Sequence, residues 1–398
     1  MIYIIFFCIL TIMALLESYL TKGSKLFLRI VAFLLLVFLA GTRYETGGDW
    51  NVYTSLYENV IPLNAALQKG SFGIDNIEPW YGLLCATIKQ LGGNIQWVFF
   101  IITFINIVLL TWALHRYTKR ILFGMLVYYS IFYFALDMLY TRQSTSVLLA
   151  LLAFTYIDEW KDWWKYALIT ILACFCHRMA LILIPLYFFA HYRLPNDIIY
   201  VLVGIGCIFM LLGIQWLSPV FLAVSKFLGS GFYNRALVYT SDANFAVQRG
   251  ISIGFILNLG LFALFMWKRK ALENLPYGKT LFSVFLASII VYYYGYELIE
   301  VSNRFRFYFF ISLVALFPKV LDTFELQMNK YIIGCSILVY LFLFNRGIFL
   351  NLPTAIAYQP YQNYIVYTIL EKRSSGEERL KQSINKTHEQ RQKMKRNN

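Results

Sequence analysis

The sequence predicts an all-α protein: a polytopic bundle of about ten full transmembrane spans, a re-entrant pair of half-helices and one outer interfacial helix. Only 14% of its 398 residues are charged and 59% are hydrophobic, whereas a soluble domain carries about 25% charged residues. Apolar runs of about 20 residues, long enough to cross a bilayer as helices, recur along the chain. An aromatic fraction of 19% suits rings placed at membrane interfaces.

The apolar runs define the predicted spans. They are residues 2–20, 26–41, 96–114, 121–137, 144–157, 198–217, 251–267, 280–298, 306–318 and 331–345. The first run lacks a basic leading region and a small-residue cleavage site, so we expect a retained span rather than a signal peptide.

Residues 166–190 are slightly long for one span and too short for two, with His177 and Arg178 in the middle. Lys and Arg gather in six loops, which can all be cytoplasmic only if this segment enters and leaves on the same side. These loops are 21–29, 115–120, 158–165, 191–197, 268–279 and 318–330. We therefore predict a re-entrant pair of half-helices with His177 and Arg178 at its apex, surrounded by protein or a polar cavity.

This topology makes residues 1–370 a single membrane domain with an outer N-terminus and two large outer loops, 41–95 and 218–250. The remaining residues, 371–398, form a basic polar tail that we expect to be disordered. The tail then ends outside, against the positive-inside tendency, unless residues 361–370 dip into the membrane.

The net charge of +14 does not indicate a nucleic-acid partner, because it lies in short loops and the tail without a binding motif. The six cysteines fall mainly in apolar runs, where they act as small packing residues. Cys174 and Cys176 precede His177 with a spacing that is wrong for the usual zinc pairs, so we expect no metal.

Arginine is a minority among the basic residues of the inner loops but dominates on the outer side. The outer arginines are Arg43, Arg142, Arg178, Arg235, Arg249, Arg304, Arg306 and Arg346. Lysine serves topology equally well, whereas the planar guanidinium fork binds phosphate or carboxylate bidentately. The bias therefore favours an anion-binding site on the outer side over simple snorkelling.

The first outer stretch, GTRYETGGDWNVY (41–53), combines Arg43, Asp49 and Tyr53 with glycines that permit close approach to a ligand. We expect a helix that starts near Gly48, with Asp49 in its first turn. The stretch EPWYGLLCATIKQLGG (78–93) has Glu78 and Pro79 as a helix start, and predicts a short interfacial helix that carries Trp80.

Further basic groups follow at span entrances and loops. They are Arg142 and Gln143 in LYTRQS, His177 and Arg178 in CHR, Arg249 in VQRG, and Arg304 and Arg306 in NRFRFYFF. A lone histidine is more often a core residue than a catalyst. His177 differs because it lies at the predicted apex of a broken helix.

The ordered set R-Y-x-x-G-x-D-W-x-x-Y, E-P-W-Y with L-G-G-N, R-Q, H-R, R-F-R-F-Y-F and a late P-Y resembles the EpsG-like family. These are Wzy-type polymerases of bacterial exopolysaccharide, capsule and O-antigen. The resemblance runs from about residue 41 to 361; the basic tail and the Ser144-Thr145-Ser146 run after Arg-Gln depart from it.

The resemblance implies a glycosyltransferase that moves an undecaprenyl-pyrophosphate-linked glycan chain onto a lipid-linked repeat unit at the outer face of the bacterial cytoplasmic membrane. It assigns pyrophosphate or substrate binding to a set of polar and aromatic side chains: Arg43, Arg142, Gln143, Arg178, Arg249, Arg304, Arg306, Tyr53 and Trp80. His177 is the first choice of base, with Asp49 and Glu78 as alternatives. We expect membrane lipid, a flippase and a chain-length regulator as partners, and no cofactor.

Two other functions remain open. A glycosyltransferase for lipid-linked sugars would use Glu45 and Asp49 as an acidic pair with a divalent metal, and would be inhibited by EDTA. A transporter or flippase of lipid-linked oligosaccharide would need no base, and would keep making long polymer when the candidate bases are neutralised.

Overall fold

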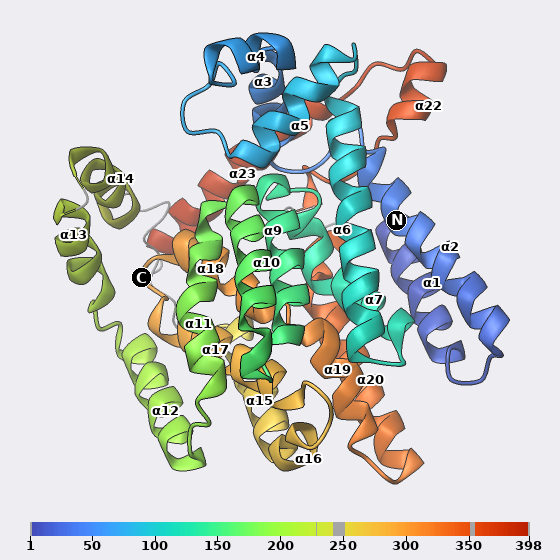
Figure 1. The fold of residues 1–398 in the computed structure, drawn as a ribbon, viewed down its shortest axis with the longest axis vertical. Coiled ribbons are helices and arrows are strands. Elements are labelled where there is room, and N and C mark those ends of the chain that lie inside the picture. The colour runs from blue at the N-terminus through green and yellow to red at the C-terminus, as the bar shows by residue number, and fades with distance from the viewer. Residues whose placement is uncertain (1, 228, 242–250, 351–354, 397–398) are drawn as a thin grey trace. The chain divides into compact units, whose positions relative to one another are not determined.

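The computed structural model describes residues 2–227, 229–241, 251–350 and 355–396. Over these residues the protein consists of helices and one isolated antiparallel bridge, between Arg43 and Asn363 (Figure 1). The chain divides into two compact units. The first comprises Met1–Thr155, Trp164–Ala180 and Phe324–Asn398; the second comprises Tyr156–Trp163 and Leu181–Thr323.

The first unit holds the N-terminal helices, the outer-loop helices and the C-terminal helices. They are α1 (Ile2–Leu16), α2 (Lys22–Gly41), α3 (Trp50–Asn59), α4 (Leu63–Lys69), α5 (Pro79–Gln90), α6 (Ile95–Tyr117), α7 (Ile121–Tyr128), the π-helix η1 (Tyr129–Tyr133), α8 (Phe134–Leu136), α9 (Thr141–Ala153), α10 (Trp163–Cys176), α20 (Gln327–Phe344), α21 (Arg346–Phe349), α22 (Tyr364–Ile369) and α23 (Gly376–Arg396).

The second unit holds the central helices of the chain. They are α11 (Leu183–His191), α12 (Asn196–Leu212), α13 (Leu217–Phe227), α14 (Ser230–Ser241), α15 (Ile253–Trp267), α16 (Arg269–Glu273), α17 (Gly278–Tyr294), α18 (Ile299–Phe310) and α19 (Leu313–Asp322). Short 3₁₀ turns join the elements at the unit boundaries: η2 (Phe154–Tyr156), η3 (Trp160–Asp162) and η4 (Arg178–Ile182).

Three of the described helices, α2, α6 and α20, are long and apolar enough to cross a membrane, and several shorter helices are also apolar. On α2 the side chains of Ile30, Leu34 and Phe38 are 44–49% exposed. Their four-residue spacing makes a continuous apolar stripe, which is what a lipid-facing helix presents. The fold is thus that of a helical membrane protein, and the count of about ten full spans stays a prediction.

Two predicted spans are broken in the structure. The run 306–318 is divided between α18 and α19, which are separated at Ile311 and Ser312. The run 198–217 ends as a helix at Leu212, and α13 leaves at 97° to α12. Residue 217 therefore begins a second helix rather than ending a span.

A buried carboxylate holds this bend. Glu297 is 4% exposed, and its oxygens accept the backbone N–H groups of Trp216 (2.8 Å), Leu217 (2.7 Å) and Ser218 (3.0 Å). These are donors that the start of α13 leaves without helical partners. A negative charge is also favourable at a helix N-terminus, so the bend is stabilised by a capping interaction that the sequence analysis did not identify.

The helix break predicted at His177 and Arg178 is confirmed. Helix α10 ends at Cys176, the turn η4 begins at Arg178, and α11 begins at Leu183. Whether the chain returns to the side from which it came stays a prediction.

The tail differs from the expected disordered segment. Residues Gly376–Arg396 form helix α23, and the side chain of Arg379 in its first turn is only 6% exposed. A buried arginine requires partners nearby, and here they are the backbone carbonyls of Glu45 and Pro360.

Cysteine labelling tests the re-entrant topology. In a background without the six native cysteines, Gln68→Cys should react with an impermeant thiol reagent in intact cells, whereas Lys119→Cys and Lys270→Cys should not. All three positions are exposed in the structure, so reactivity reports the side of the membrane. Equal labelling of positions 68 and 270 would contradict the same-side return of residues 166–190, because a full crossing there inverts all later loops.

Candidate active site

Three of the predicted site residues meet in the first unit. The Glu78 Oε2 accepts a hydrogen bond from Arg142 Nη1 at 2.8 Å, and its other oxygen, Oε1, lies 3.7 Å from His177 Nε2. Glu78 is 8% exposed as a residue. A carboxylate that is buried this far is costly unless it is paired, so the guanidinium and the imidazole stabilise its position.

Glu78 is placed by the start of α5. Pro79 is the first residue of that helix, and a proline disfavours the helical conformation for the residue before it. Glu78 accordingly has extended φ and ψ of −65° and 134° and does not cap the helix with its side chain. The carboxylate can therefore turn away from α5 towards Arg142.

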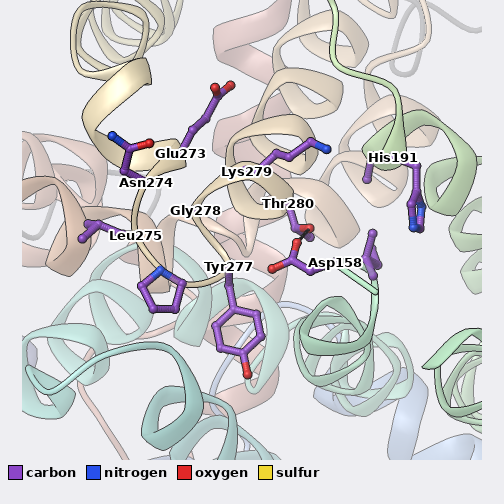
Figure 2. A pocket seen from close by; sticks show the side chains of 12 residues that line it. Asp158, His191, Glu273, Asn274, Leu275, Tyr277, Gly278, Lys279 and Thr280 are labelled. Atoms are coloured by element: carbon purple, nitrogen blue, oxygen red, sulfur yellow. Dashed lines mark hydrogen bonds between the residues drawn. The ribbon is translucent and has the colours of Figure 1, made fainter. Parts of the chain in front are cut away.

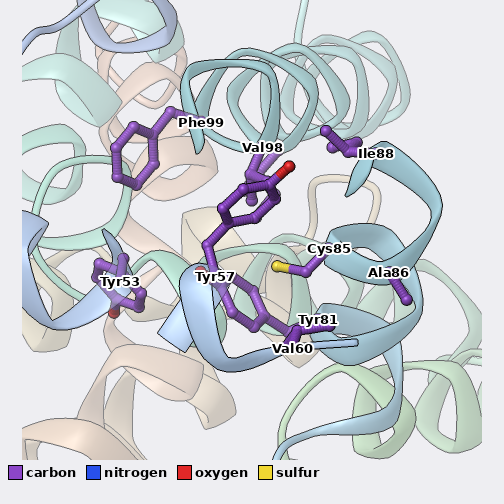
Figure 3. Packing of buried hydrophobic residues seen from close by; sticks show 10 residues of the cluster. Tyr53, Tyr57, Val60, Tyr81, Cys85, Ala86, Ile88, Val98 and Phe99 are labelled. Atoms are coloured by element: carbon purple, nitrogen blue, oxygen red, sulfur yellow. The ribbon is translucent and has the colours of Figure 1, made fainter. Parts of the chain in front are cut away.

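A hydrophobic cluster supports this helix start. Buried side chains from α3, α5 and the first turns of α6 pack together, with Tyr57, Tyr81 and Cys85 near the centre (Figure 3). The Tyr57 hydroxyl donates to Gly93 O at 2.7 Å, and Lys89 Nζ donates to the carbonyls of Glu58 and Val60 at 2.7 and 2.8 Å. The first outer loop is therefore a packed subdomain rather than a flexible tether.

Two antiparallel helices, α9 and α10, place Arg142 and His177 close together at neighbouring helix ends. The Ser146 hydroxyl on α9 donates to Ala173 O on α10 at 2.8 Å. Arg142 precedes Ser146 by one helical turn, and His177 follows Ala173 by one turn. The same contact that packs the helices thus places the guanidinium of Arg142 and the imidazole of His177 close to Glu78.

The backbone also sets the orientation of the imidazole. The Met179 N–H donates to His177 Nδ1 at 3.4 Å. Nδ1 is then the acceptor nitrogen, and we assign the proton of the neutral ring to Nε2, which faces Glu78. His177 presents a donor to the carboxylate in this state.

A buried polar network lies around the start of α9, and sequence reasoning did not identify its members Asp137 and Asn106. Asp137 is fully buried, and its carboxylate accepts Asn106 Nδ2 and the Tyr128 hydroxyl, each at 2.7 Å. Asn106 also donates to Ser144 Oγ at 2.8 Å and accepts from Thr145 Oγ1 at 2.8 Å. The signal in the sequence was a carboxylate and an amide within apolar runs, where polar groups are rarely incidental.

Arg43 belongs to this network rather than to an open surface. Its side chain is fully buried, Nη1 donates to Asp137 O, and Nη2 donates to Thr141 Oγ1 at 3.1 Å. Its guanidinium lies 4.2 Å from the centroid of the Phe99 ring. These contacts give Arg43 a packing role, and we leave it out of the group that meets a substrate.

Tyr53 is also buried. Its ring packs against Tyr81 and Phe99, and its hydroxyl donates to Leu139 O at 2.9 Å. Burial raises the pKa of this phenol, and the charges of Arg142 and Asp49 act on it in opposite directions. Asp49, the N-cap residue of α3, is therefore an electrostatic neighbour of the Glu78 cluster.

The other predicted site residues of the first unit differ in how far their side chains are buried. Trp80 is half-buried, and its indole N–H is buried without a hydrogen-bond partner among the described residues. Gln143 is 2% exposed within α9, whereas Arg178 is exposed in the turn η4. Trp80 thus offers a donor beside Glu78.

The remaining predicted arginines lie elsewhere in the chain. Arg304 and Arg306 are in α18 of the second unit, where Arg306 donates to Asn258 Oδ1 and lies over the rings of Tyr292 and Phe310. Arg249 lies outside the described residues. Their part in phosphate binding stays a prediction.

The second unit has a cavity of about 400 Å³ that contains none of the predicted site residues (Figure 2). Its acidic groups already have partners: Asp158 accepts from Thr280, and Glu273 pairs with Arg193 and Arg269. The described part of the chain also contains no cluster of three His, Cys, Asp or Glu side chains that could hold a metal ion.

A comparison with known protein families identifies the family of this chain. The model of the EpsG family matches residues 25–363. The chain belongs to the EpsG family. Its members are exopolysaccharide and O-antigen polymerase-like proteins. Searches of curated proteins and of solved structures each found no match.

The EpsG match ends at Asn363, the residue that forms the backbone bridge with Arg43. The matched region therefore includes the whole Glu78 cluster and its buried support. The helix α23 lies beyond it.

The buried network should be essential for stability in this EpsG protein. Asp137→Leu removes the acceptor of both Asn106 and Tyr128, and each buried donor left unsatisfied costs about 1–3 kcal/mol. We expect a clearly lower midpoint of thermal unfolding in detergent, whereas Asp75→Leu on an exposed loop should leave it unchanged. An unchanged midpoint for Asp137→Leu would show that the network does not stabilise the start of α9.

Proposed function

We propose that the protein is a polysaccharide polymerase that transfers a glycan chain from undecaprenyl pyrophosphate to a lipid-linked repeat unit at the outer face of the cytoplasmic membrane. Family membership supports the polymerase-like class. The observation that supports the chemistry is the Glu78 carboxylate held between Arg142 and His177. One carboxylate, one fork-shaped cation and one imidazole are the groups that such a transfer needs.

The reaction forms one bond and breaks one bond. A hydroxyl of the acceptor sugar attacks the anomeric carbon of the growing chain, and the bond from that carbon to the pyrophosphate oxygen breaks. The bonding electrons leave with the lipid pyrophosphate. The hydroxyl proton must pass to a base, and the charge that develops on the pyrophosphate must be neutralised.

We assign the proton to Glu78 and the pyrophosphate to Arg142. From the sequence, His177 is the first choice of base. In the structure its Nδ1 accepts the Met179 N–H and its Nε2 faces the Glu78 carboxylate. In that state the ring orients Glu78 by presenting its Nε2–H to Oε1, and the proton from the acceptor hydroxyl stays on the carboxylate. His177 is therefore a positioning residue that acts through the carboxylate.

The Arg142 ion pair gives a reason for the base to act only when substrate is present. About a third of the Arg142 side chain is exposed, and Nη1 makes its bond to Glu78. An arriving pyrophosphate competes for the guanidinium, because arginine binds phosphate bidentately. Once the guanidinium turns to the pyrophosphate, Oε2 of Glu78 loses its hydrogen bond to Arg142 and is open to the acceptor hydroxyl.

Trp80 is our candidate for contact with the sugar. It follows Glu78 by two residues on α5, and its buried indole N–H has no partner among the described atoms. A sugar hydroxyl or phosphate oxygen would satisfy that donor. Tyr53 is less suited to stacking because its ring is already packed against other rings.

Neutralising the base should slow transfer without preventing binding. We expect Glu78→Gln to lower the turnover number of the purified protein on lipid-linked repeat units by roughly 10²–10⁴, which is typical of a lost general base. Binding of the lipid-linked unit should persist. Glu58→Gln, an exposed carboxylate on α3, is the matched control and should retain full turnover. Near-normal turnover by Glu78→Gln would contradict the assignment of Glu78 as the base and would make Asp49 the next candidate.

Replacing the guanidinium should affect the pyrophosphate. Arg142→Lys keeps the charge but loses the fork, so we expect a rise in KM and a fall in turnover of roughly tenfold or more. The exposed Arg373→Lys is the control, with protein levels matched by immunoblot. Full polymer length in Arg142→Lys cells would show that the pyrophosphate binds elsewhere.

A further inference from the structure

The first outer loop is paired with a segment more than 300 residues later in the chain. The Tyr44 N–H donates to Gln362 O at 2.8 Å, and the Tyr364 N–H donates to Thr42 O at 2.7 Å. The Gly47 N–H donates to Ala357 O at 2.9 Å. Two segments, residues 42–47 and 357–364, thus lie side by side and exchange backbone hydrogen bonds. We refer to these two segments as the paired strands.

The tail beyond the family region is attached to both strands. Gln362 is fully buried, and its Oε1 accepts from Ser374 Oγ at 3.0 Å and from the Ser375 N–H at 3.3 Å. Gly376 follows directly. A Cβ at Gly376 would lie 2.4 Å from Glu45 Cβ, so only glycine allows the tail to approach the loop this closely.

Arg379 completes the attachment. Its Nη2 donates to Glu45 O at 2.9 Å and its Nη1 donates to Pro360 O at 2.8 Å, so one guanidinium joins the two strands. Glu45 has a φ of 44°, in the left-handed region that non-glycine residues rarely adopt. Such a conformation persists only where surrounding contacts hold it, and Arg379 supplies one of them.

The loop held by Arg379 is in contact with the residues that precede Arg142. A Cβ at Gly47 would lie 2.5 Å from Met138 O, and one at Gly48 would lie 2.5 Å from Leu139 Cδ1. The Tyr53 hydroxyl also bonds Leu139 O. A continuous series of contacts therefore leads from the tail through the outer loop to the start of α9, where Arg142 lies.

We propose that residues 374–379 are a latch that holds the loop 43–48 against the start of α9, with Arg379 as a positioning residue for Arg142. The latch also requires the tail to lie on the same side of the membrane as the first outer loop. The effect of the latch on turnover rests on the function proposed above, whereas its effect on the loop does not.

Thiol reactivity at position 46 measures the latch directly. Thr46 is fully buried beneath the paired strands, so Thr46→Cys in a background without native cysteines should react slowly with an impermeant reagent. Adding Arg379→Met keeps an unbranched side chain that can fill much of the same space but removes both donors. We expect labelling to become roughly tenfold faster or more, since hydrogen bonds from a charged donor are lost. Arg373→Met, an exposed arginine in the same segment, should leave the rate unchanged.

Two further measurements distinguish a local opening of the loop at position 46 from a general loss of structure. A protein that retains only the fully buried Cys85 should stay unreactive when Arg379→Met is added, because the core beneath α5 remains closed. Gly376→Val should reproduce the faster labelling of position 46 if Arg379→Met does not accumulate. Arg379→Lys, which keeps the charge, should give an intermediate rate.

The outcomes are distinct. Unchanged labelling of position 46 in both Arg379→Met and Gly376→Val would overturn the latch, and so would simultaneous exposure of Cys85. Faster labelling together with a lower turnover number and a raised KM for repeat units, the changes expected of Arg142→Lys, supports the positioning role. If labelling rises but the native protein elongates no lipid-linked glycan, the latch stands and the proposed polymerase function fails.

Discussion

A negative charge at Glu78 has to be balanced within a largely apolar protein, and much of the first unit is arranged around that requirement. The ion pair between Glu78 and Arg142 requires α9 to begin next to the carboxylate. The contact with His177 requires α10 to end next to the same carboxylate. The hydrogen bond from Ser146 to Ala173 couples the two helices. Removing the Arg142 guanidinium would leave the carboxylate without its charged partner, which is costly for a buried charge.

The supporting layer is polar as well. Arg43, Asp137 and Asn106 are fully buried and satisfy one another through side-chain and backbone bonds. Such networks stabilise a unique arrangement only when nearly every member has a partner. The break between α8 and α9 exposes backbone groups that a continuous helix would have paired, and this network occupies that break. The irregular backbone between α8 and α9 is thus surrounded by polar partners within the protein.

Some of the site was predictable from local signals. Glu78 before Pro79 indicated a helix start, and the charge balance of the loops indicated a break at His177, which the structure has. Burial of Arg43 and Tyr53 was not predictable, because a short sequence stretch does not specify the distant partner that covers it. The docking of Arg379 on Glu45 and Pro360 likewise depends on residues far apart in the chain. The polar positions inside apolar runs, Asp137 and Asn106, were the signal that sequence reasoning passed over.

Helix length has a consequence for the surrounding bilayer. Helix α1 has 15 residues, which corresponds to about 22 Å at 1.5 Å per residue, against a hydrocarbon thickness of about 30 Å. Its outward side chains Ile5, Ile9 and Ile12 are 37–58% exposed, so this short helix has an apolar face that suits contact with lipid. A short lipid-facing helix is accommodated by local thinning of the membrane. Thinning at such a wall brings the lipid phosphates of both leaflets closer together, so the membrane surface next to α1 would be depressed.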